Sequence, residues 1–286
     1  MLIVQIVGGL GNQMFQYALA RSLHEQGYKI KLDISAFGSY KLHGGYQLLK
    51  YNISIPIATA EEINKLKINR FFVAFEKYLH IPFSKWIQEK TFLFQKNLIT
   101  SDNVYISGYF QTEKYFLKIR DILLEEFVLT QSISTYTNIM KDSIENTEQS
   151  VSLHVRRGDY IHNPIALKTH GVCSLEYYQT AIDFLEKQYS NITFFLFSDD
   201  IDWVRENLSA KNSVVVSSEE KRLPHEDIYL MSLCSHNIIA NSSFSWWGAW
   251  LNQNPKKIVI APKKWFADKK LQKQSDDIIP ESWLKL

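Results

Sequence analysis

The second half of the chain alternates apolar runs with helical patterns, and this alternation limits the possible folds more than any other feature. Strands are expected at residues 151–155, 193–197, 213–216, 236–240 and 257–261. Helices are expected between them, at residues 175–189, 202–208, 225–234 and 245–253. Strands joined through helices by short loops form a parallel sheet covered on both faces. Because such crossovers are right-handed, all the strands end along one edge of the sheet.

The first residues of the chain carry the same pattern. Residues 2–7 predict a strand, residues 8–13 a tight glycine turn, residues 14–26 a helix ended by Gly27, and residues 28–33 a second strand. A strand, a glycine turn, a helix and a strand are the usual opening of an open parallel sheet. Weaker signals predict helices within 61–85, a strand at 104–110 and a helix at 113–127.

A length of 286 residues suits two domains. Residues 131–150 are polar and contain little Leu or Val, which favours a boundary near residue 145. We therefore expect one domain at 1–145 and a second at 146–262. The Lys-rich segment 263–286 is expected to pack back across both domains.

The composition excludes several classes of protein. The two cysteines, Cys173 and Cys234, form neither a disulfide framework nor a metal cluster, so a reducing cytosol is the simplest compartment. A net charge of +2 does not favour a nucleic-acid partner. The first residues resemble a strand and not a secretion signal. No apolar run approaches the ~18 residues that span a bilayer.

Polar motifs follow four of the expected strands. They are the glycine turn at 8–13, His-Val-Arg-Arg-Gly-Asp-Tyr at 154–160, Ser-Asp-Asp at 198–200 and Asn-Ser-Ser-Phe-Ser at 241–245. The carboxyl edge of an open parallel sheet is where ligands bind. Four such motifs from two sheets indicate a ligand held in a cleft between two domains.

The arginines of the second motif fit a diphosphate. Arg156 and Arg157 carry permanent charges on planar forks of donors that match phosphate oxygens. Ser242, Ser243 and the N-terminus of the following helix add neutral donors for the same anion. Each arginine could instead form a surface pair with Asp159, and either serine could be only an N-cap.

Other residues of the motifs could have either a functional or a purely structural role. Asp199 and Asp200 are either a metal-carrying pair or acceptors for the N–H edge of a guanine base, and Asp200 could simply cap a helix. Asn12 and its neighbouring Gln could cap a helix or bind sugar and phosphate. His154 could be a buried neutral histidine. Trp246 and Trp250, four residues apart on a helix, fit a core better than a sugar-stacking platform.

Together these motifs resemble the α-1,2-fucosyltransferases of glycosyltransferase family 11. The resemblance rests on GGLGNQMFQYA at 8–18, HVRRGDY at 154–160, FSDD at 197–200 and NSSFSWWGAWL at 241–251, and it extends from residue 4 to about residue 262. The HxRRGD element alone is shared with the wider group of α-1,2, α-1,6 and protein O-fucosyltransferases. The SSFSWWGAWL element is what favours family 11.

The resemblance implies a fold and a reaction. The fold is α/β, with two facing Rossmann-like domains of the GT-B type and the active site in the cleft between them. The reaction transfers L-fucose from GDP-L-fucose to the 2-hydroxyl of a terminal β-galactose, with inversion and without a metal ion or other cofactor. The product carries an α-1,2 linkage.

The resemblance also implies roles for single residues. Arg156 contacts the diphosphate, Asn12 lies near the reaction centre, and His154 with Asp199 or Asp200 lies at guanine. Asp159 is a candidate general base, although it could equally hold an arginine in place. The remaining candidates for binding the donor are Gly11, Arg157, Asn241, Ser242, Ser243 and Phe244.

Relatives from animal cells carry a membrane anchor ahead of the first motif, whereas the first strand here is expected to start at residue 2. We therefore expect a bacterial cytosolic enzyme that acts before export of a lipid-linked glycan. The Lys-rich segment is either a solvated surface or a face toward an anionic membrane at the inner side of the plasma membrane.

Two other classes compete with this hypothesis. A dehydrogenase would use the glycine turn for a dinucleotide, but the turn lacks the GxGxxG spacing. A non-catalytic glycan-binding module would use the aromatic residues, which make up 14% of the chain, and would leave the arginine motif without a purpose.

Overall fold

The computed structural model describes residues 1–38, 44–67, 86–99, 101–216 and 223–286. The chain divides into two compact units, Met1–Thr130 and Gln131–Leu286, and each is described by itself. The boundary expected near residue 145 lies instead between residues 130 and 131. Helix α5 (Thr135–Glu145) packs on α10 (Pro224–Leu233) and so belongs to the second unit.

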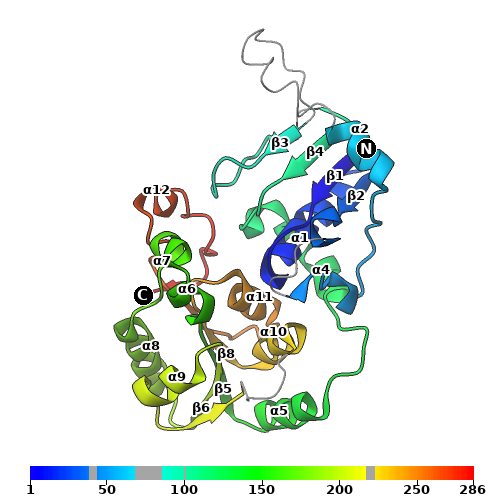
Figure 1. Cartoon of the computed structure of the whole chain (residues 1–286). Coiled ribbons are helices and arrows are strands. Elements are labelled where there is room, and N and C mark those ends of the chain that lie inside the picture. The colour runs from blue at the N-terminus through cyan, green and yellow to red at the C-terminus, as the bar shows by residue number, and fades with distance from the viewer. Residues whose placement is uncertain (39–43, 68–85, 100, 217–222) are drawn as a thin grey trace. The chain divides into compact units, whose positions relative to one another are not determined.

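The first unit is built on a four-stranded parallel sheet with the order β2-β1-β4-β3. Figure 1 shows helices on both sides of this sheet. Its elements are β1 (Leu2–Gln5), α1 (Leu10–Glu25), β2 (Ile30–Asp33), α2 (Ala60–Lys67), β3 (Trp86–Gln88), β4 (Val104–Ser107) and α4 (Arg120–Glu126), with short 3-10 helices at Ser35–Gly38, Leu48–Lys50, Glu113–Tyr115 and Leu117–Ile119.

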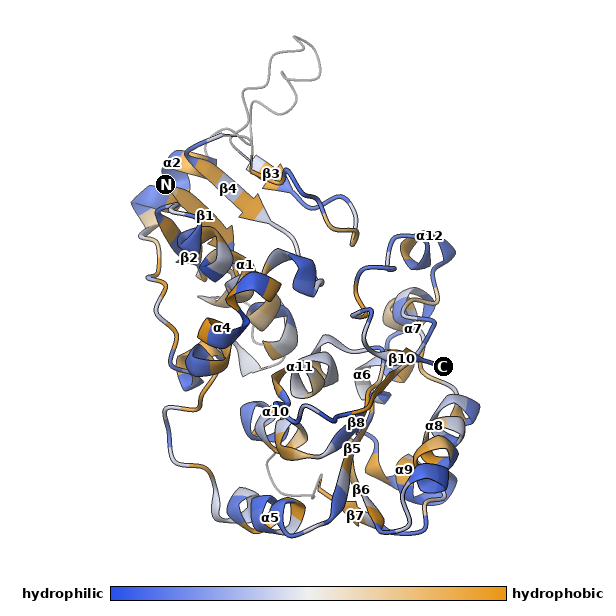
Figure 2. Cartoon of the chain, turned by 180° about the vertical axis from the view of Figure 1, so that it is seen from behind, coloured by the Kyte–Doolittle hydropathy of each residue, from blue (hydrophilic) through white to orange (hydrophobic). Residues whose placement is uncertain are grey.

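Apolar strands form the centre of this unit. Strands β1 and β4 are hydrophobic along most of their length (Figure 2). Ile3 and Tyr105 from these strands pack with Ile63 and Leu66 of α2, and all four are buried. The predicted strand at 104–110 is shorter than expected. It ends at Ser107 because Gly108 and Phe110 have positive φ angles, of 155° and 53°.

Two predicted helices of this unit differ in the structure. Helix α1 begins at Leu10, because the extended backbone of Gly9 caps it without any side-chain bond. Asn12 therefore lies inside the helix and does not cap it. The helix predicted at 113–127 is divided into two 3-10 turns and α4, because Phe116 leaves the helical backbone. Its ring is buried and lies 6.0 Å from that of Phe15.

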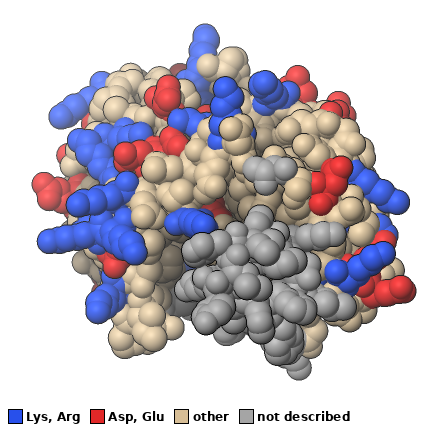
Figure 3. Space-filling model, turned by 90° about the horizontal axis from the view of Figure 1, so that it is seen from above, with Lys and Arg blue, Asp and Glu red and all other residues tan. Residues whose placement is uncertain are grey.

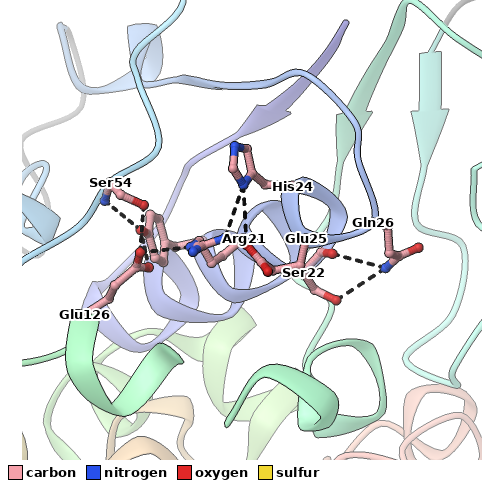
Figure 4. A network of polar contacts seen from close by, with 8 residues as sticks. Arg21, Ser22, His24, Glu25, Gln26, Ser54 and Glu126 are labelled. Carbon is pink, nitrogen blue, oxygen red and sulfur yellow. Dashed lines mark hydrogen bonds and ion pairs between the residues drawn. The ribbon is translucent and has the colours of Figure 1, made fainter. Parts of the chain in front are cut away.

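A polar network ties α1 to the rest of the first unit (Figure 4). The Tyr17 hydroxyl donates to Glu126 Oε2 at 2.6 Å, and Arg21 Nε and the Ser54 hydroxyl donate to Glu126 Oε1 at 2.8 and 2.6 Å. Burial and the Glu126 carboxylate raise the pKa of Tyr17 well above its usual value. Tyr17 therefore remains a hydroxyl donor at all physiological pH values, which keeps the network intact.

The second unit is built on a six-stranded parallel sheet with the order β10-β9-β8-β5-β6-β7. Besides α5 and α10, its elements are β5 (Gln149–Val155), α6 (Gly158–His162), α7 (Pro164–His170), α8 (Leu175–Gln188), β6 (Ile192–Ser198), α9 (Ile201–Asn207), β7 (Ser213–Val215), β8 (His236–Ile238), α11 (Ser243–Leu251), β9 (Val259–Ala261), α12 (Lys269–Gln272) and β10 (Leu284–Lys285).

Apolar side chains cover both faces of this sheet. Strand β6 sends Phe194 and Leu196 to one face, where α8 packs, and Phe195 and Phe197 to the other, where α5 and α10 pack. The period of two along the strand explains why its whole sequence is apolar. The predicted parallel sheet, covered on both faces, is thus confirmed, and so are its five strands and four helices within a few residues at each end.

The segment after β9 and the loop after β5 contain structure that the sequence did not predict. Strand β10 extends the sheet beside β9, and Trp283 packs against Trp246 with 5.4 Å between ring centroids. Helices α6 and α7 lie between β5 and α8, where no helix was predicted. Trp246 and Trp250 are almost fully buried, which confirms their prediction as core residues. Within the described residues, no helix is both long and apolar enough to cross a membrane.

Candidate functional site

The direction of the second sheet changes between β5 and β8. From β5 the chain moves outward through β6 to β7, and it then returns to place β8 on the other side of β5. The carboxyl ends of strands at such a switch point diverge, and ligands of open α/β sheets bind there. The residues after β5 and β8 are those of the second and fourth predicted motifs, so the topology brings these motifs together.

Arg156 directly follows β5 and pairs with a carboxylate from the end of β6. Its guanidinium lies 2.8 Å from Asp199 Oδ2, with 26% of the arginine side chain exposed. Burial alone would raise the pKa of Asp199, but the Arg156 charge and the backbone N–H groups of Arg157 and Gly158 lower it overall. Asp199 is therefore ionised, and it holds a partly exposed guanidinium at the edge of the sheet.

Gly158 allows this close approach. A Cβ atom at position 158 would lie 2.8 Å from Asp199 Oδ2, which is closer than real side chains come. The glycine of the RRGD motif is thus required for its space next to the ion pair.

Arg157 has different surroundings from Arg156. Its Nε donates to Asp200 Oδ2 at 3.0 Å, and its guanidinium lies over the Trp203 ring, 4.1 Å from the centroid. Asp200 also accepts from the backbone N–H of Trp203 and caps α9, which confirms its interpretation as a helix cap. The contacts of Arg157 hold α9 against the end of β5 and indicate a supporting role.

Some residues after β8 are buried and support the structure, and others are partly exposed. Asn241 donates to the backbone oxygens of His170 and Trp265, at 3.0 and 3.1 Å, and is 3% exposed. Ser242 caps α11 by accepting from the backbone N–H of Phe244, as one of its two interpretations predicted. Ser243 is the first residue of that helix and is partly exposed. Of this motif, Ser243 is the side chain best placed to meet a ligand.

Aromatic rings surround the end of β5. His154 is buried, and its ring centroid lies 5.6 Å from that of Phe244. Tyr160 stacks on His170, with centroids 4.9 Å apart and planes inclined by 13°, and Arg156 lies 5.6 Å from the Tyr160 centroid. Of these rings, that of Tyr160 contacts the Arg156 guanidinium directly, as a cation–π pair.

The first unit has its own switch point, between β1 and β4. Gly8, after β1, has a φ of 82°, as the predicted tight turn requires. Asn12 Oδ1 accepts from Gln111 Nε2 at 2.7 Å, so residues after the two strands are joined. Gly11, in the first turn of α1, is buried. This edge presents neutral amides where the other unit presents charges.

Two residues of this edge were not predicted from the sequence. Gln111 orients Asn12 through the bond above. Glu89, just beyond β3, accepts from the backbone N–H groups of Tyr109 and Phe110 at 2.7 and 3.0 Å. Burial raises the pKa of Glu89, although these two bonds lower it in part. The sequence alone does not identify Glu89 as a site residue, because its hydrogen-bond partners depend on the backbone turn at 108–110.

The general-base candidate Asp159 belongs to α6, but its side chain lies outside the described residues. Within the described part of the chain, no three His, Cys, Asp or Glu side chains form a group that could hold a metal ion.

A parallel α/β sheet with an arginine at its switch point defines a binding site for an anionic ligand. The family profile described as Glycosyl transferase family 11 matches residues 1–286. The chain belongs to glycosyltransferase family 11, and the predicted family is confirmed.

Curated relatives agree with this assignment. An Alpha-1,2-colitosyltransferase of Escherichia coli is 37% identical over 100% of this chain and 98% of its own length. The O-antigen biosynthesis glycosyltransferase WbnK of Escherichia coli is 34% identical over 98% of each. Galactoside alpha-(1,2)-fucosyltransferase 2 of Pongo pygmaeus is 25% identical over 87% of this chain and 68% of its own length.

The fold also resembles a solved structure. The fucosyltransferase NodZ from Bradyrhizobium has a TM-score of 0.50 and 14% identity, over 86% of this chain and 91% of its own. This likeness concerns the fold and agrees with the predicted α/β class. The cleft between two facing domains stays a prediction.

Proposed function

We propose that this protein transfers L-fucose from GDP-L-fucose to the 2-hydroxyl of a terminal β-galactose, with inversion and without a metal ion. The observation that carries the proposal is the partly exposed Arg156 at the β5–β8 switch point, fixed by Asp199 and in contact with the Tyr160 ring. A permanently charged fork of donors at a ligand-binding edge fits a diphosphate better than it fits an uncharged glycan.

In this proposal Arg156 stabilises the leaving group. Breaking the bond between fucose and phosphate leaves additional negative charge on GDP and positive charge on the sugar. A preorganised, permanently charged guanidinium stabilises that charge without a metal. Asp199 then positions Arg156, and Ser243 with the first N–H groups of α11 adds neutral donors.

The carboxylates of Asp199 and Asp200 can still bind the guanine of GDP. Asp199 and Asp200 are each engaged, with Arg156 and with the cap of α9, but a carboxylate accepts about four hydrogen bonds. Recognition of the guanine N–H edge by one of them can therefore coexist with its supporting role. His154, which the family resemblance implies to lie at guanine, is buried, and its ring centroid lies 5.6 Å from that of Phe244.

The amide edge of the first unit is proposed to serve the acceptor side. Asn12, oriented by Gln111, offers a neutral donor near the reacting sugar, where a charge would compete with the oxocarbenium-like transition state. A base must also accept the proton of the 2-hydroxyl. Asp159 remains the candidate, and Glu89, whose pKa is raised by burial, is the alternative that the structure adds.

A second donor is favoured by one relative. The colitosyltransferase named above is 37% identical to this chain, and colitose is L-fucose without its 3-hydroxyl. A site that hydrogen-bonds the 3-hydroxyl rejects the deoxy sugar by roughly 10⁴-fold, whereas an apolar site discriminates far less. The two GDP-sugars offered at equal concentration distinguish these cases.

The test is a turnover assay. Purified protein is incubated with GDP-L-fucose and a panel of β-galactosides in the presence of EDTA, and the linkage of the product is determined by NMR. We expect release of GDP only when an acceptor is present, with fucose on the 2-hydroxyl. Turnover that EDTA abolishes would contradict the metal-free mechanism. Stabilisation by NAD instead of GDP would contradict the class of enzyme.

A further inference from the structure

Lysines gather in a short segment near the end of the second unit. Between residues 262 and 274 there are five lysines and one aspartate, whereas the whole chain has a net charge of only +2. The lysines are all exposed: Lys263, Lys264, Lys269, Lys270 and Lys273. Figure 3 shows basic side chains gathered on the side where Figure 1 places α12.

The aspartate of this segment does not balance its lysines. The Asp268 carboxylate accepts from the backbone N–H groups of Lys270 and Leu271 at 2.8 and 2.9 Å and caps α12. Its negative charge is directed at the start of the helix. The segment therefore presents a strongly positive surface.

An exposed apolar helix adjoins these lysines. The backbone N–H of Ala267 donates to Thr169 O at 3.0 Å, and that of Asp268 donates to the same oxygen at 3.1 Å, so the end of α7 is joined to the start of α12. None of the residues of α7 is buried. Ile165 is 78% exposed, Leu167 is 41% exposed, and Lys168 lies beside them.

We propose that α7, α12 and the lysines around them form a contact with an anionic lipid surface. The combination identifies this partner. Lysines attract anionic headgroups, and exposed aliphatic side chains enter the boundary between headgroups and acyl chains. A soluble anion would use the lysines but would gain nothing from Ile165 and Leu167. An uncharged glycan would gain nothing from the lysines.

The contact is reversible. The two aliphatic side chains bury little apolar area compared with a membrane-spanning helix. The attraction between the six lysines and the anionic lipids falls off within a Debye length. Binding should therefore weaken steeply with salt. The surface requires no change of fold, because α7 and α12 already lie side by side.

The experiment is co-sedimentation of the full chain with vesicles. We expect binding to vesicles of phosphatidylcholine with phosphatidylglycerol, and little binding to phosphatidylcholine alone. Lys269→Glu with Lys270→Glu should weaken binding about tenfold or more, since each lysine near an anionic surface contributes several-fold. Ile165→Asp should weaken binding by a similar factor at constant phosphatidylglycerol.

Matched control variants come from the same chain. Lys118→Glu with Lys187→Glu changes the net charge equally at two exposed positions elsewhere, and Leu117→Asp replaces an aliphatic side chain that is 51% exposed. These controls should bind like the unaltered protein. Thermal melting confirms that every variant is folded.

The outcomes separate this proposal from the enzymatic one. Equal binding to both vesicle types, no binding at all, or equal losses in the controls would overturn the lipid contact. Turnover of GDP-L-fucose with a soluble galactoside should remain unchanged in Lys269→Glu with Lys270→Glu. That assay tests the catalytic function without reference to the lipid surface.

Discussion

The two units place different chemistry at equivalent positions of their sheets. The switch point of the second unit holds an arginine that pairs with Asp199 and contacts the Tyr160 ring, whereas that of the first holds the neutral pair of Asn12 and Gln111. A parallel sheet supplies the same edge in both cases, and the residues after its strands decide what can bind. The difference suits one edge to a diphosphate and the other to an uncharged sugar.

The largest effect should come from Arg156. Arg156→Ala removes the charge that stabilises the leaving GDP, and we expect kcat/KM for GDP-L-fucose to fall by about 10³-fold. Arg156→Lys keeps the charge and loses the fork, so it should recover only part of the activity. Steady-state kinetics measures both. Activity of Arg156→Ala within tenfold of the unaltered enzyme would contradict the comparison.

A substitution at Gly158 tests whether GDP binding depends on the position of the Arg156–Asp199 ion pair. Gly158→Ala introduces a Cβ atom 2.8 Å from Asp199 Oδ2, so the carboxylate or the turn must shift. We expect affinity for GDP to fall about tenfold or more, since each lost charge-assisted bond is worth roughly 1.5–3 kcal/mol. Gly27→Ala, which meets no atom within 4 Å but strains a positive φ, controls for backbone effects. Unchanged GDP binding in Gly158→Ala would argue against the role of the pair.

The amide edge should show a different kinetic signature. Asn12→Ala and Gln111→Leu should each lower kcat, by about ten- to a hundredfold, and leave the dissociation constant of GDP nearly unchanged. Gln111→Leu acts through the orientation of Asn12, so the double variant should lose little more than Asn12→Ala alone. Losses that multiply would show that Gln111 acts independently.

A smaller effect concerns pH. Because the folded pKa of Asp199 lies below the ordinary value of an Asp side chain, its contribution to stability is present above about pH 4 and is lost as pH falls through the lowered pKa. Asp199→Asn should therefore destabilise the protein at pH 7 and show less loss of stability below pH 4. Denaturant unfolding at several pH values measures this. Parallel curves for the two proteins would contradict the assigned ionisation.

The sequence predicted the second sheet well because its strands are fully buried. Apolar runs such as that of β6 have few alternatives, and helices with caps such as Ser174 before α8 are recognisable locally. The first unit was harder, because α1 begins on Gly9 without a side-chain cap and Phe116 interrupts a helical pattern to bury its ring. Of the helices predicted within 61–85, the first is confirmed as α2 (Ala60–Lys67), and residues 68–85 lie outside the described residues.

The candidate site could be predicted only in part. Motifs indicated which strand ends carry polar residues, and parallel topology implied that those of one sheet share an edge. The sequence could not predict which of these side chains pair with each other, because pairing depends on distances across the edge of the sheet. Arg156 pairs with Asp199, whereas Arg157 pairs with Asp200 and lies over the Trp203 ring. Asn241 donates its amide hydrogens to the backbone oxygens of His170 and Trp265.

The most direct test compares two ligands that differ only in the diphosphate. Calorimetry measures the affinity of the unaltered protein and of Arg156→Ala for GDP and for guanosine. We predict that the substitution weakens GDP binding at least about tenfold, as the loss of one charge-assisted contact to phosphate would, and leaves guanosine binding unchanged. Equal losses for both ligands, or none for GDP, would contradict the claim that this guanidinium holds the phosphates.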